Sequence, residues 1–465
     1  MSAIPTIARD MTILGLDIGT NLIKVVEMRS ARGSLQLLNL GIRPTPPEVI
    51  SNGVIVDPAA LGSAIRGLVQ AQGIRTRAVI ASVAGQSSLV VRHIEVPKMS
   101  RAELADTMRW EVERQIPFAA SEVIMDYQPL IEPEELPEDR QNMEVLLAAA
   151  QEDMVNAYLE TFQVAGLQPR ALDIEGLAAT RALVNLRAAD GLHDQTVALV
   201  NIGATTTDIS IIRDGLLSFN RPVPMAGDSL TNAISENLGR DLGEAERLKK
   251  EVGVVLLDQR PTAAVPAPAA PEAEQKTPGA AAAEPPADEH APEFDLAAEL
   301  DDIAPQQRQA QPAPEQIFDL SRPPEVAPSA EPAAKPEPAA AGAPAEASAQ
   351  PRPGIQLSTE AVSRRVFEAM LPALSELVSE IRRSLDYYRS RFPDSAVDRV
   401  LLFGGTAKLE NLAQFVSNEI GIQVELANPL ERLDFVPPFY SKPYLDEIAC
   451  LLPIALGLAT RDMLE

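Results

Sequence analysis

The stretch GLDIGTNLIKVVEM (15–28) decides the fold, because it joins two apolar segments through a short turn that contains glycine. With the preceding residues, TILGLDIG (12–19), it predicts a buried strand, a tight turn and a second strand. VNIGATTTDISII (200–212) repeats the pattern at a constant offset of 184 residues. We interpret the repetition as a weak internal duplication, which predicts two similar halves with a cleft between them.

Both turns have the composition of an anion site. Each places glycine and small hydroxyl residues where backbone N–H groups can converge on a phosphate. Lys24 follows the first turn at a spacing that lets it reach back as a point charge, and Asp17 could hold water around Mg²⁺. Neither turn is a P-loop, because no GK[ST] and no helix follow. A single turn of this kind is more often a plain hairpin, but its repetition favours phosphate binding.

Strand and helix patterns alternate along the rest of the chain. TVALVNIG (196–203) and VDRVLLFGG (397–405) read as buried strands that end in glycine. The longest helical pattern occupies 355–392 and contains Pro372, which should kink it. A second amphipathic helix pattern, at 409–420, is followed by glycine. The alternation predicts the α/β class.

Two further segments carry candidate binding residues. Gly404 and Gly405 end a predicted strand, and their small size would let a flat ring approach the backbone. DLGEAERLKK (241–250) begins with the spacing of a helix capping box. Glu246 and Lys249 share one face of that helix, where they either grip a ribose and a base or form an exposed ion pair.

The composition excludes several classes of protein. Lys and Arg number 40 and Asp and Glu number 66, so the net charge is −26, which disfavours non-specific binding to nucleic acid or anionic lipid. The single cysteine and three separated histidines predict neither a disulfide framework nor a His/Cys metal centre. The first twenty residues lack a signal-peptide pattern, and no apolar run is long enough to span a bilayer. We therefore expect a cytoplasmic protein.

One segment has a different composition from the rest. Residues 261–353 contain 20 of the 40 prolines and 16 acidic against 5 basic residues. Such a sequence cannot bury enough apolar surface to offset its ordering entropy, which predicts a disordered insertion. Two short islands, EFDLAAELDDI (293–303) and QIFDL (316–320), are either chance apolar residues or helices that dock into a partner.

Taken in order, the two hairpins, the helix with the AE-R-L-K pattern and the strand ending in two glycines resemble the actin-like ATPase superfamily. Within it, the chain most resembles the PilM family of type IV pilus assembly proteins. IPF at 116–118 and DY at 126–127 favour that family over the related FtsA. Four stretches carry the resemblance: DIGTNLIKVVEM (17–28), RWEVERQIPFAASEVIMDYQPL (109–130), VNIGATTTDISIIRDG (200–215) and VDRVLLFGGTAKLENL (397–412).

The resemblance implies an α/β, actin-like ATPase fold, in which two similar halves surround a nucleotide cleft. It further implies an arrangement of subdomains like that of FtsA and PilM. The implied first-half core consists of 11–40, 166–190 and 436–465, and the implied inserted subdomain is 41–165. The second half, with the second phosphate and adenosine motifs, consists of 191–255 and 355–435. The disordered insertion is 256–354. The insertion is foreign to the compact family pattern.

The resemblance also implies ATP and Mg²⁺ as cofactors, with roles assigned by position. The first phosphate loop would consist of Asp17, Gly19, Thr20, Asn21 and Lys24, with Asp17 also near the metal ion. The second phosphate loop would consist of Gly203, Ala204, Thr205 and Thr206. The remaining nucleotide contacts would come from Gly227, from Glu246 and Lys249 at the ribose and base, and from Gly404, Gly405 and Thr406 over the adenosine. Glu175 resembles the acid that positions the attacking water in related chaperones, although it could equally be a solvated or capping carboxylate.

The resemblance implies a function in pilus assembly rather than fast catalysis. Asn201 stands where many superfamily members have a second Mg²⁺-orienting aspartate, which predicts slow ATP hydrolysis or none. The protein would bind the cytoplasmic tail of a PilN-like protein, and further assembly-platform or motor components are conceivable partners. Its place would be the inner face of the inner membrane, without insertion of its own.

Three alternative functions remain open. An FtsA-like division protein would carry a basic amphipathic membrane helix, and the sequence after the last core-like helix, GLATRDMLE, does not have that character. An actin-fold kinase for small molecules would need a catalytic base, and the sequence does not identify one. A scaffold that no longer binds nucleotide would not need Lys24 or the two glycine turns.

Overall fold

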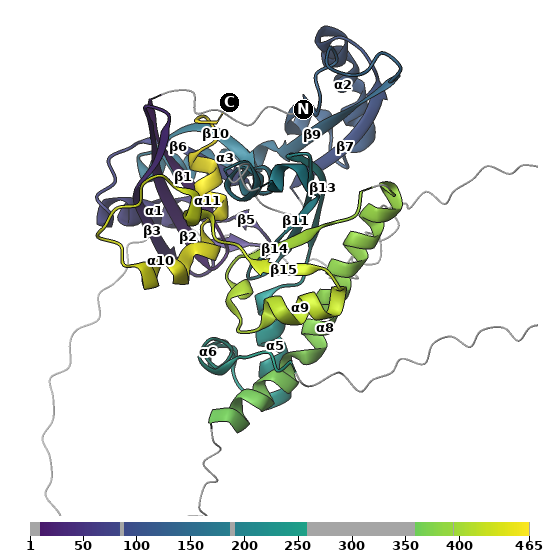
Figure 1. Cartoon of the computed structure of the whole chain (residues 1–465). Helices are drawn as coiled ribbons and strands as arrows, with labels where there is room; N and C mark the ends of the chain where they lie inside the picture. The colour runs from purple at the N-terminus through teal and green to yellow at the C-terminus, as the bar shows by residue number, and fades with distance from the viewer. Residues whose placement is uncertain (1–9, 84–87, 187–190, 258–358, 394, 465) are drawn as a thin grey trace, which may run out of the picture. The chain divides into compact units, whose positions relative to one another are not determined.

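The computed structural model describes residues 10–83, 88–186, 191–257, 359–393 and 395–464 (Figure 1). The predicted insertion, 256–354, lies almost wholly outside the described residues, as do both of its apolar islands. Within the described residues, no helix is both long enough and apolar enough to cross a bilayer.

The N-terminal hairpin forms the middle of a five-stranded sheet. β1 pairs antiparallel with β2, and β2 pairs antiparallel with β3, whereas β6 and β10 continue the sheet on the other side of β1 as parallel strands. In spatial order the strands are β10 (Gln168–Ile174), β6 (Ala78–Val83), β1 (Met11–Ile18), β2 (Leu22–Ala31) and β3 (Ser34–Pro44). A separate two-residue hairpin pairs β4 (Ile50–Ser51) with β5 (Val54–Ile55).

The second hairpin lies at the middle of another five-stranded sheet with the same topology. β11, β12 and β13 form the antiparallel meander, and β14 and β15 extend the sheet as parallel strands beyond β11. In spatial order the strands are β13 (Leu216–Val223), β12 (Thr207–Arg213), β11 (Val197–Ile202), β14 (Arg399–Phe403) and β15 (Gln423–Leu426). The predicted α/β class and the predicted duplication are confirmed.

Helices cover both sheets and follow the predicted patterns. The long pattern is one continuous helix, α8, with Pro372 inside it, and the pattern at 409–420 is α9, which ends where Gly421 adopts a left-handed conformation. On the first half lie α1 (Pro58–Ala71), α3 (Glu152–Ala165), α4 (Glu175–Thr180), α10 (Lys442–Ile448) and α11 (Pro453–Ala459). On the second half lie α5 (Gly227–Leu238), α6 (Leu242–Val252), α8 (Thr359–Arg391) and α9 (Leu412–Ile420).

A small sheet with one helix has a core of its own. Its strands, in the order β7 (Leu89–Pro97), β9 (Asn142–Gln151) and β8 (Val123–Pro129), are covered on one face by α2 (Arg101–Gln115). By contrast, β6 and the helices α1 and α3 share a core with β1. The predicted inserted segment, 41–165, therefore contains residues of two cores, and narrower bounds of 89–151 describe the part with a core of its own.

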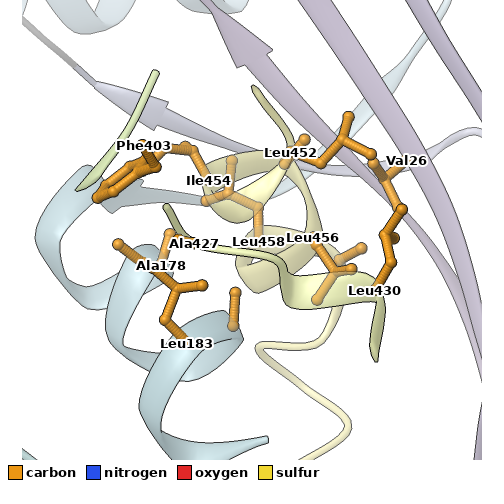
Figure 2. Close-up of a cluster of buried hydrophobic side chains, with 14 of the residues drawn as sticks. Val26, Ala178, Leu183, Phe403, Ala427, Leu430, Leu452, Ile454, Leu456 and Leu458 are labelled. Carbon is orange, nitrogen blue, oxygen red and sulfur yellow. The ribbon is translucent and has the colours of Figure 1, made fainter. Parts of the chain in front are cut away.

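The two halves meet through a tightly packed apolar cluster (Figure 2). Leu456 and Leu458 of α11 lie in it beside Val26 of the first sheet and Phe403 of the second. Glycine makes the close approach possible, because a Cβ atom on Gly15 of β1 would overlap the backbone of α11. The first strand of the candidate phosphate hairpin is thus in direct contact with the helix that joins the halves.

Candidate functional site

The first hairpin turn is held from both sides. The N–H of Gly19 donates to Leu22 O at 3.0 Å, so Thr20 and Asn21 form the tip of the turn. Thr45 fixes the tip from outside, because its hydroxyl donates to Gly19 O at 2.7 Å and its N–H donates to Asn21 O at 3.0 Å. These bonds fix the loop in place before any ligand binds.

Lys24 and Asp17 face each other across this hairpin. They are paired in the register of β1 and β2, and Lys24 Nζ lies 2.7 Å from Asp17 Oδ2. The Asp17 carboxylate is nearly buried, so its charge needs this partner. The ammonium group of Lys24 is therefore fixed beside the turn, where the sequence predicts a cation that binds phosphate.

The second hairpin reproduces the backbone of the first. The N–H of Gly203 donates to Thr206 O at 3.0 Å, as Gly19 does to Leu22, and the offset of 184 residues is conserved in the pairing. The same offset places Asp208, opposite Asn201, where the first hairpin has Lys24. Asp208 is not among the residues predicted from the sequence, although applying the offset to Lys24 leads to it.

Polar side chains of both hairpins converge on Glu175. Glu175 begins α4, and Asn201 Nδ2 donates to Glu175 Oε2 at 3.2 Å. Burial raises the pKa of Glu175 well above its usual range, and the charges of Asp208 and Asp17 raise it further against the opposing effect of Lys24. The structure therefore places Glu175, the predicted catalytic acid, in contact with Asn201 and close enough to Asp17, the predicted metal residue, for the charge of Asp17 to affect it.

Asp208 has a perturbed carboxyl group as well. Burial raises the pKa of Asp208 to about 6, and a hydrogen bond from the Thr206 hydroxyl acts in the opposite direction. Within the described residues, no group of three or more His, Cys, Asp or Glu side chains is placed to hold a metal ion alone. This donor set fits Mg²⁺ bound together with phosphates, since Mg²⁺ usually takes one or two carboxylates and keeps several waters.

The end of β14 packs directly on the second hairpin. Gly404 has a φ of +93°, and a Cβ atom there would lie 2.5 Å from Asn201 Oδ1 and 2.6 Å from Ile202 O, so no other residue fits. Around Gly405, by contrast, the space that a Cβ would occupy is open. The Thr406 hydroxyl donates to Gly203 O at 2.8 Å, which ties this loop to the second phosphate turn.

The start of α5 completes the set of loops. Gly227 N–H donates to Gly203 O at 3.2 Å, and Asp228 N–H donates to Ala204 O at 2.8 Å. A Cβ atom on Gly227 would overlap the Thr406 hydroxyl, so glycine is required for this contact. Asp228 is not among the residues predicted from the sequence, and burial raises its pKa despite the nearby Lys249.

Glu246 and Lys249 belong to a partly buried network rather than forming an exposed ion pair. Lys249 Nζ donates to Gly227 O at 2.8 Å and to the Thr231 hydroxyl at 2.7 Å, and it lies 2.6 Å from Glu246 Oε2. Burial would raise the pKa of Glu246, but hydrogen bonds from Lys249 and Thr231 hold it below the usual value. All three ammonium protons have protein acceptors, so Lys249 positions the start of α5, and its contact with a ribose or base stays a prediction.

The structure thus brings the second turn, the loop at Gly404 and the start of α5 into contact, and the cluster around Glu175 links them to the first hairpin. Thr20, Asn21, Ala204 and Thr205 lie in the two turns, and Gly203 is the point that the loops of Gly227 and Thr406 both contact. The spacing of glycine and threonine in the sequence predicted this convergence, whereas the carboxylate cluster depends on strand register and on α4.

Comparison with known proteins agrees with this geometry. The family model for type IV pilus assembly protein PilM matches residues 15–255, and that for cell division protein FtsA matches residues 198–444. FtsA of Streptococcus pneumoniae serotype 2 is 26% identical over 266 residues, which are 53% of this chain and 57% of the relative. FtsA of Bacillus subtilis is 26% identical over 265 residues, 53% of this chain and 59% of the relative. The matches thus span less than two thirds of these curated relatives.

A solved PilM-PilN type IV pilus biogenesis complex is similar over nearly the whole chain. The two chains are 25% identical, 98% of this chain and 99% of the other are covered, and the TM-score is 0.68. The hairpins, the duplicated sheets and this similarity point to the same superfamily. Because the PilM model covers more than half of the sequence, the chain belongs to the PilM family of type IV pilus assembly proteins, within the actin-like ATPase superfamily that includes FtsA.

Proposed function

We propose that the chain is a cytoplasmic ATP-binding protein of the type IV pilus assembly platform that docks the cytoplasmic tail of a PilN-like membrane protein. Family membership supports the pilus context. The observation that carries nucleotide binding is a pair of hairpins of matching register, linked by the polar cluster around Glu175. The loop at Gly404 and the start of α5 pack on the second of these hairpins. Further platform or motor components are additional partners in this proposal.

ATP would lie between the two hairpins. Backbone N–H groups of both turns would bind the phosphates, and Lys24, already fixed beside the first turn, would add a cation. Asp17 and Asp208 would hold Mg²⁺, which would neutralise phosphate charge. The space beside Gly405 would admit the adenosine, with Glu246 nearest the ribose.

Slow hydrolysis, or none, would follow from the amide at position 201, beside the predicted catalytic acid Glu175. Asn201 donates to Glu175 but brings no negative charge that could attract a metal ion. The protein would therefore hold ATP long enough for the bound state to set which conformation is populated.

The PilN-like tail would bind beside the small subdomain of residues 89–151. β8 is the outer strand of its sheet, and α3 of the first half packs against β8. Ile124 on β8 and Leu159 on α3 are 49% and 41% exposed. Exposed apolar side chains on adjoining elements next to an open strand edge suit an extended peptide with apolar anchors.

A labelled peptide with the cytoplasmic sequence of a PilN-like protein tests the docking proposal. Fluorescence anisotropy of the peptide with the full chain should show saturable binding, at least about tenfold weaker for Ile124→Glu and Leu159→Glu. Leu242→Glu, at an exposed leucine on the second half, is the matched control and should bind as the unaltered chain does. Equal binding by all four proteins would overturn the docking site.

An FtsA-like division function is the alternative, favoured by the match of the FtsA model to residues 198–444. Flotation with vesicles of phosphatidylglycerol and phosphatidylethanolamine separates the two. An FtsA-like protein should bind bare vesicles through its own amphipathic helix. Our proposal expects recruitment only when the vesicles carry the PilN-like tail, which would place the protein on the inner face of the inner membrane.

A further inference from the structure

The outer face of α2 presents a large aromatic side chain to solvent. Leu104 and Met108 on its inner face are buried in the small core, whereas Trp110 is 73% exposed. It is the single tryptophan of the chain. This exposure excludes Trp110 from the hydrophobic core. Tryptophan is the side chain most enriched among residues that dominate binding energy at protein interfaces.

Carboxylates flank this tryptophan on the same helix face. Asp106 and Glu113 stand four residues before and three residues after Trp110, and both are exposed. Asp106 is paired with Arg109, and the other two arginines of the helix, Arg101 and Arg114, pair with Glu132 and Glu111. Within the described residues none of the three is paired with Glu113, which remains the charged carboxylate beside the indole ring. The indole ring thus lies in an acidic setting.

The net charge of the whole small subdomain is also negative. Residues 89–151 contain 13 acidic and 6 basic residues, a net charge of −7. An acid-rich segment, 132–139, is tied to the start of α2 by the pair of Arg101 and Glu132. A cation that approaches Trp110 therefore meets a favourable field and an aromatic face.

Charge selects the occupant of this face. The chain's own segment 261–353 carries −11 and a second copy carries −26, so both are repelled by the subdomain, as are anionic lipids. We propose that the outer face of α2, centred on Trp110, docks a basic segment of a partner protein, with an arginine or lysine stacked on the indole and paired with Glu113.

This surface is separate from the proposed tail site. α2 covers the face of the small sheet that carries Val145 and Leu147, whereas Leu146, which points to the opposite face, joins the core shared by the two halves. Trp110 points away from the sheet altogether. The protein could therefore hold a PilN-like tail and a basic partner at the same time.

The single tryptophan makes the test direct. The full chain, in low salt, is titrated with a short synthetic peptide of alternating arginine and glycine, and the tryptophan emission is recorded. We expect a saturable change that high salt removes and that a peptide of alternating glutamate and glycine does not cause. Unchanged emission, or an equal response to the acidic peptide, would overturn the proposal.

Variants locate the binding independently of that signal. By anisotropy of labelled arginine peptide, Trp110→Ala and Glu113→Lys should each weaken binding at least about fivefold. The controls are Phe439→Ala, at another exposed aromatic, and Glu360→Lys, at an exposed acid of α8, and each should stay within about twofold. Equal losses for all four variants would show diffuse charge attraction and contradict a site on α2. Circular dichroism confirms folding, which neither α2 substitution should alter, because both side chains are exposed.

Discussion

The two hairpins have the same backbone pattern but differ in the charges of the side chains that face each other across them. Across the first, Asp17 is neutralised by Lys24 at 2.7 Å, while across the second the corresponding positions hold Asn201 and Asp208. In our proposal, the duplicated backbone supplies a phosphate-binding turn twice. The side chains differ, so the first hairpin would offer a cation to phosphate, whereas the second would offer a carboxylate to a metal ion. The shared fold provides the site, and the unequal side chains determine what it does.

The largest effect should follow from loss of the cation. Lys24→Ala leaves Asp17 nearly buried without a partner and removes the phosphate contact, so ATP affinity should fall about 100-fold or more and the free energy of unfolding by about 3 kcal/mol. Titration with a fluorescent ATP analogue and thermal unfolding measure these quantities. Lys442→Ala, at an exposed lysine on α10, is the control and should change neither. ATP affinity within threefold of the unaltered chain, about 0.7 kcal/mol, would remove Lys24 from the site.

The opposite result is expected at the corresponding position of the second hairpin. The pKa of Asp208 is about 6 in the folded protein and about 4 when unfolded, so the folded state holds a proton that the unfolded chain has lost. The free energy of unfolding should therefore fall as the pH rises from about 4 to about 6, by at most about 3 kcal/mol from this group.

Asp208→Asn removes the loss of stability that comes from ionising this buried carboxyl group. At pH 7.5 without metal it should be more stable than the unaltered chain, but it should bind Mg·ATP more weakly, because one metal-side carboxylate is lost. Denaturant unfolding across the pH range and ATP titration with and without Mg²⁺ check both parts. A variant that is less stable without metal and binds Mg·ATP normally would contradict the assignment.

A smaller effect should come from restoring similarity between the hairpins. Asn201→Asp replaces the donor to Glu175 by another carboxylate, which should lower the free energy of unfolding at pH 7.5 by about 1–2 kcal/mol without metal. Mg²⁺ with ATP should recover much of the loss. If the missing charge limits hydrolysis, phosphate release should rise in the variant. A loss of stability that Mg·ATP does not reduce would show that position 201 lies outside the metal site.

The smallest effect should lie outside both hairpins. Glu246→Gln keeps the shape of the side chain but weakens its pairing with Lys249, so ATP affinity should fall only about threefold. If Glu246 meets the ribose, the loss should shrink for 2′-deoxy-ATP. An equal loss for both nucleotides would show that Glu246 acts only through Lys249 and the start of α5.

Patterns along the chain could predict the hairpins and the helices α8 and α9, because they depend on local spacing of apolar residues and glycine. The offset between the hairpins predicted two similar halves, and the structure adds that their two sheets share one topology. The same offset, applied to Lys24, leads to the position of Asp208, but its raised pKa could not be predicted, because that depends on burial in the folded protein. The exposure of Trp110 also could not be predicted, because it depends on which face of α2 the small sheet covers.

The most direct test of a slow, ATP-holding protein is to identify what it retains. The purified chain is incubated with Mg·ATP, separated from free nucleotide and denatured, and the released nucleotide is identified by chromatography, with Lys24→Ala in parallel. We predict about one intact ATP per chain, and none with the variant. Mostly ADP would contradict slow hydrolysis, and equal retention by both proteins would contradict the site. If neither retains nucleotide, equilibrium titration decides, and no binding there would contradict the central claim.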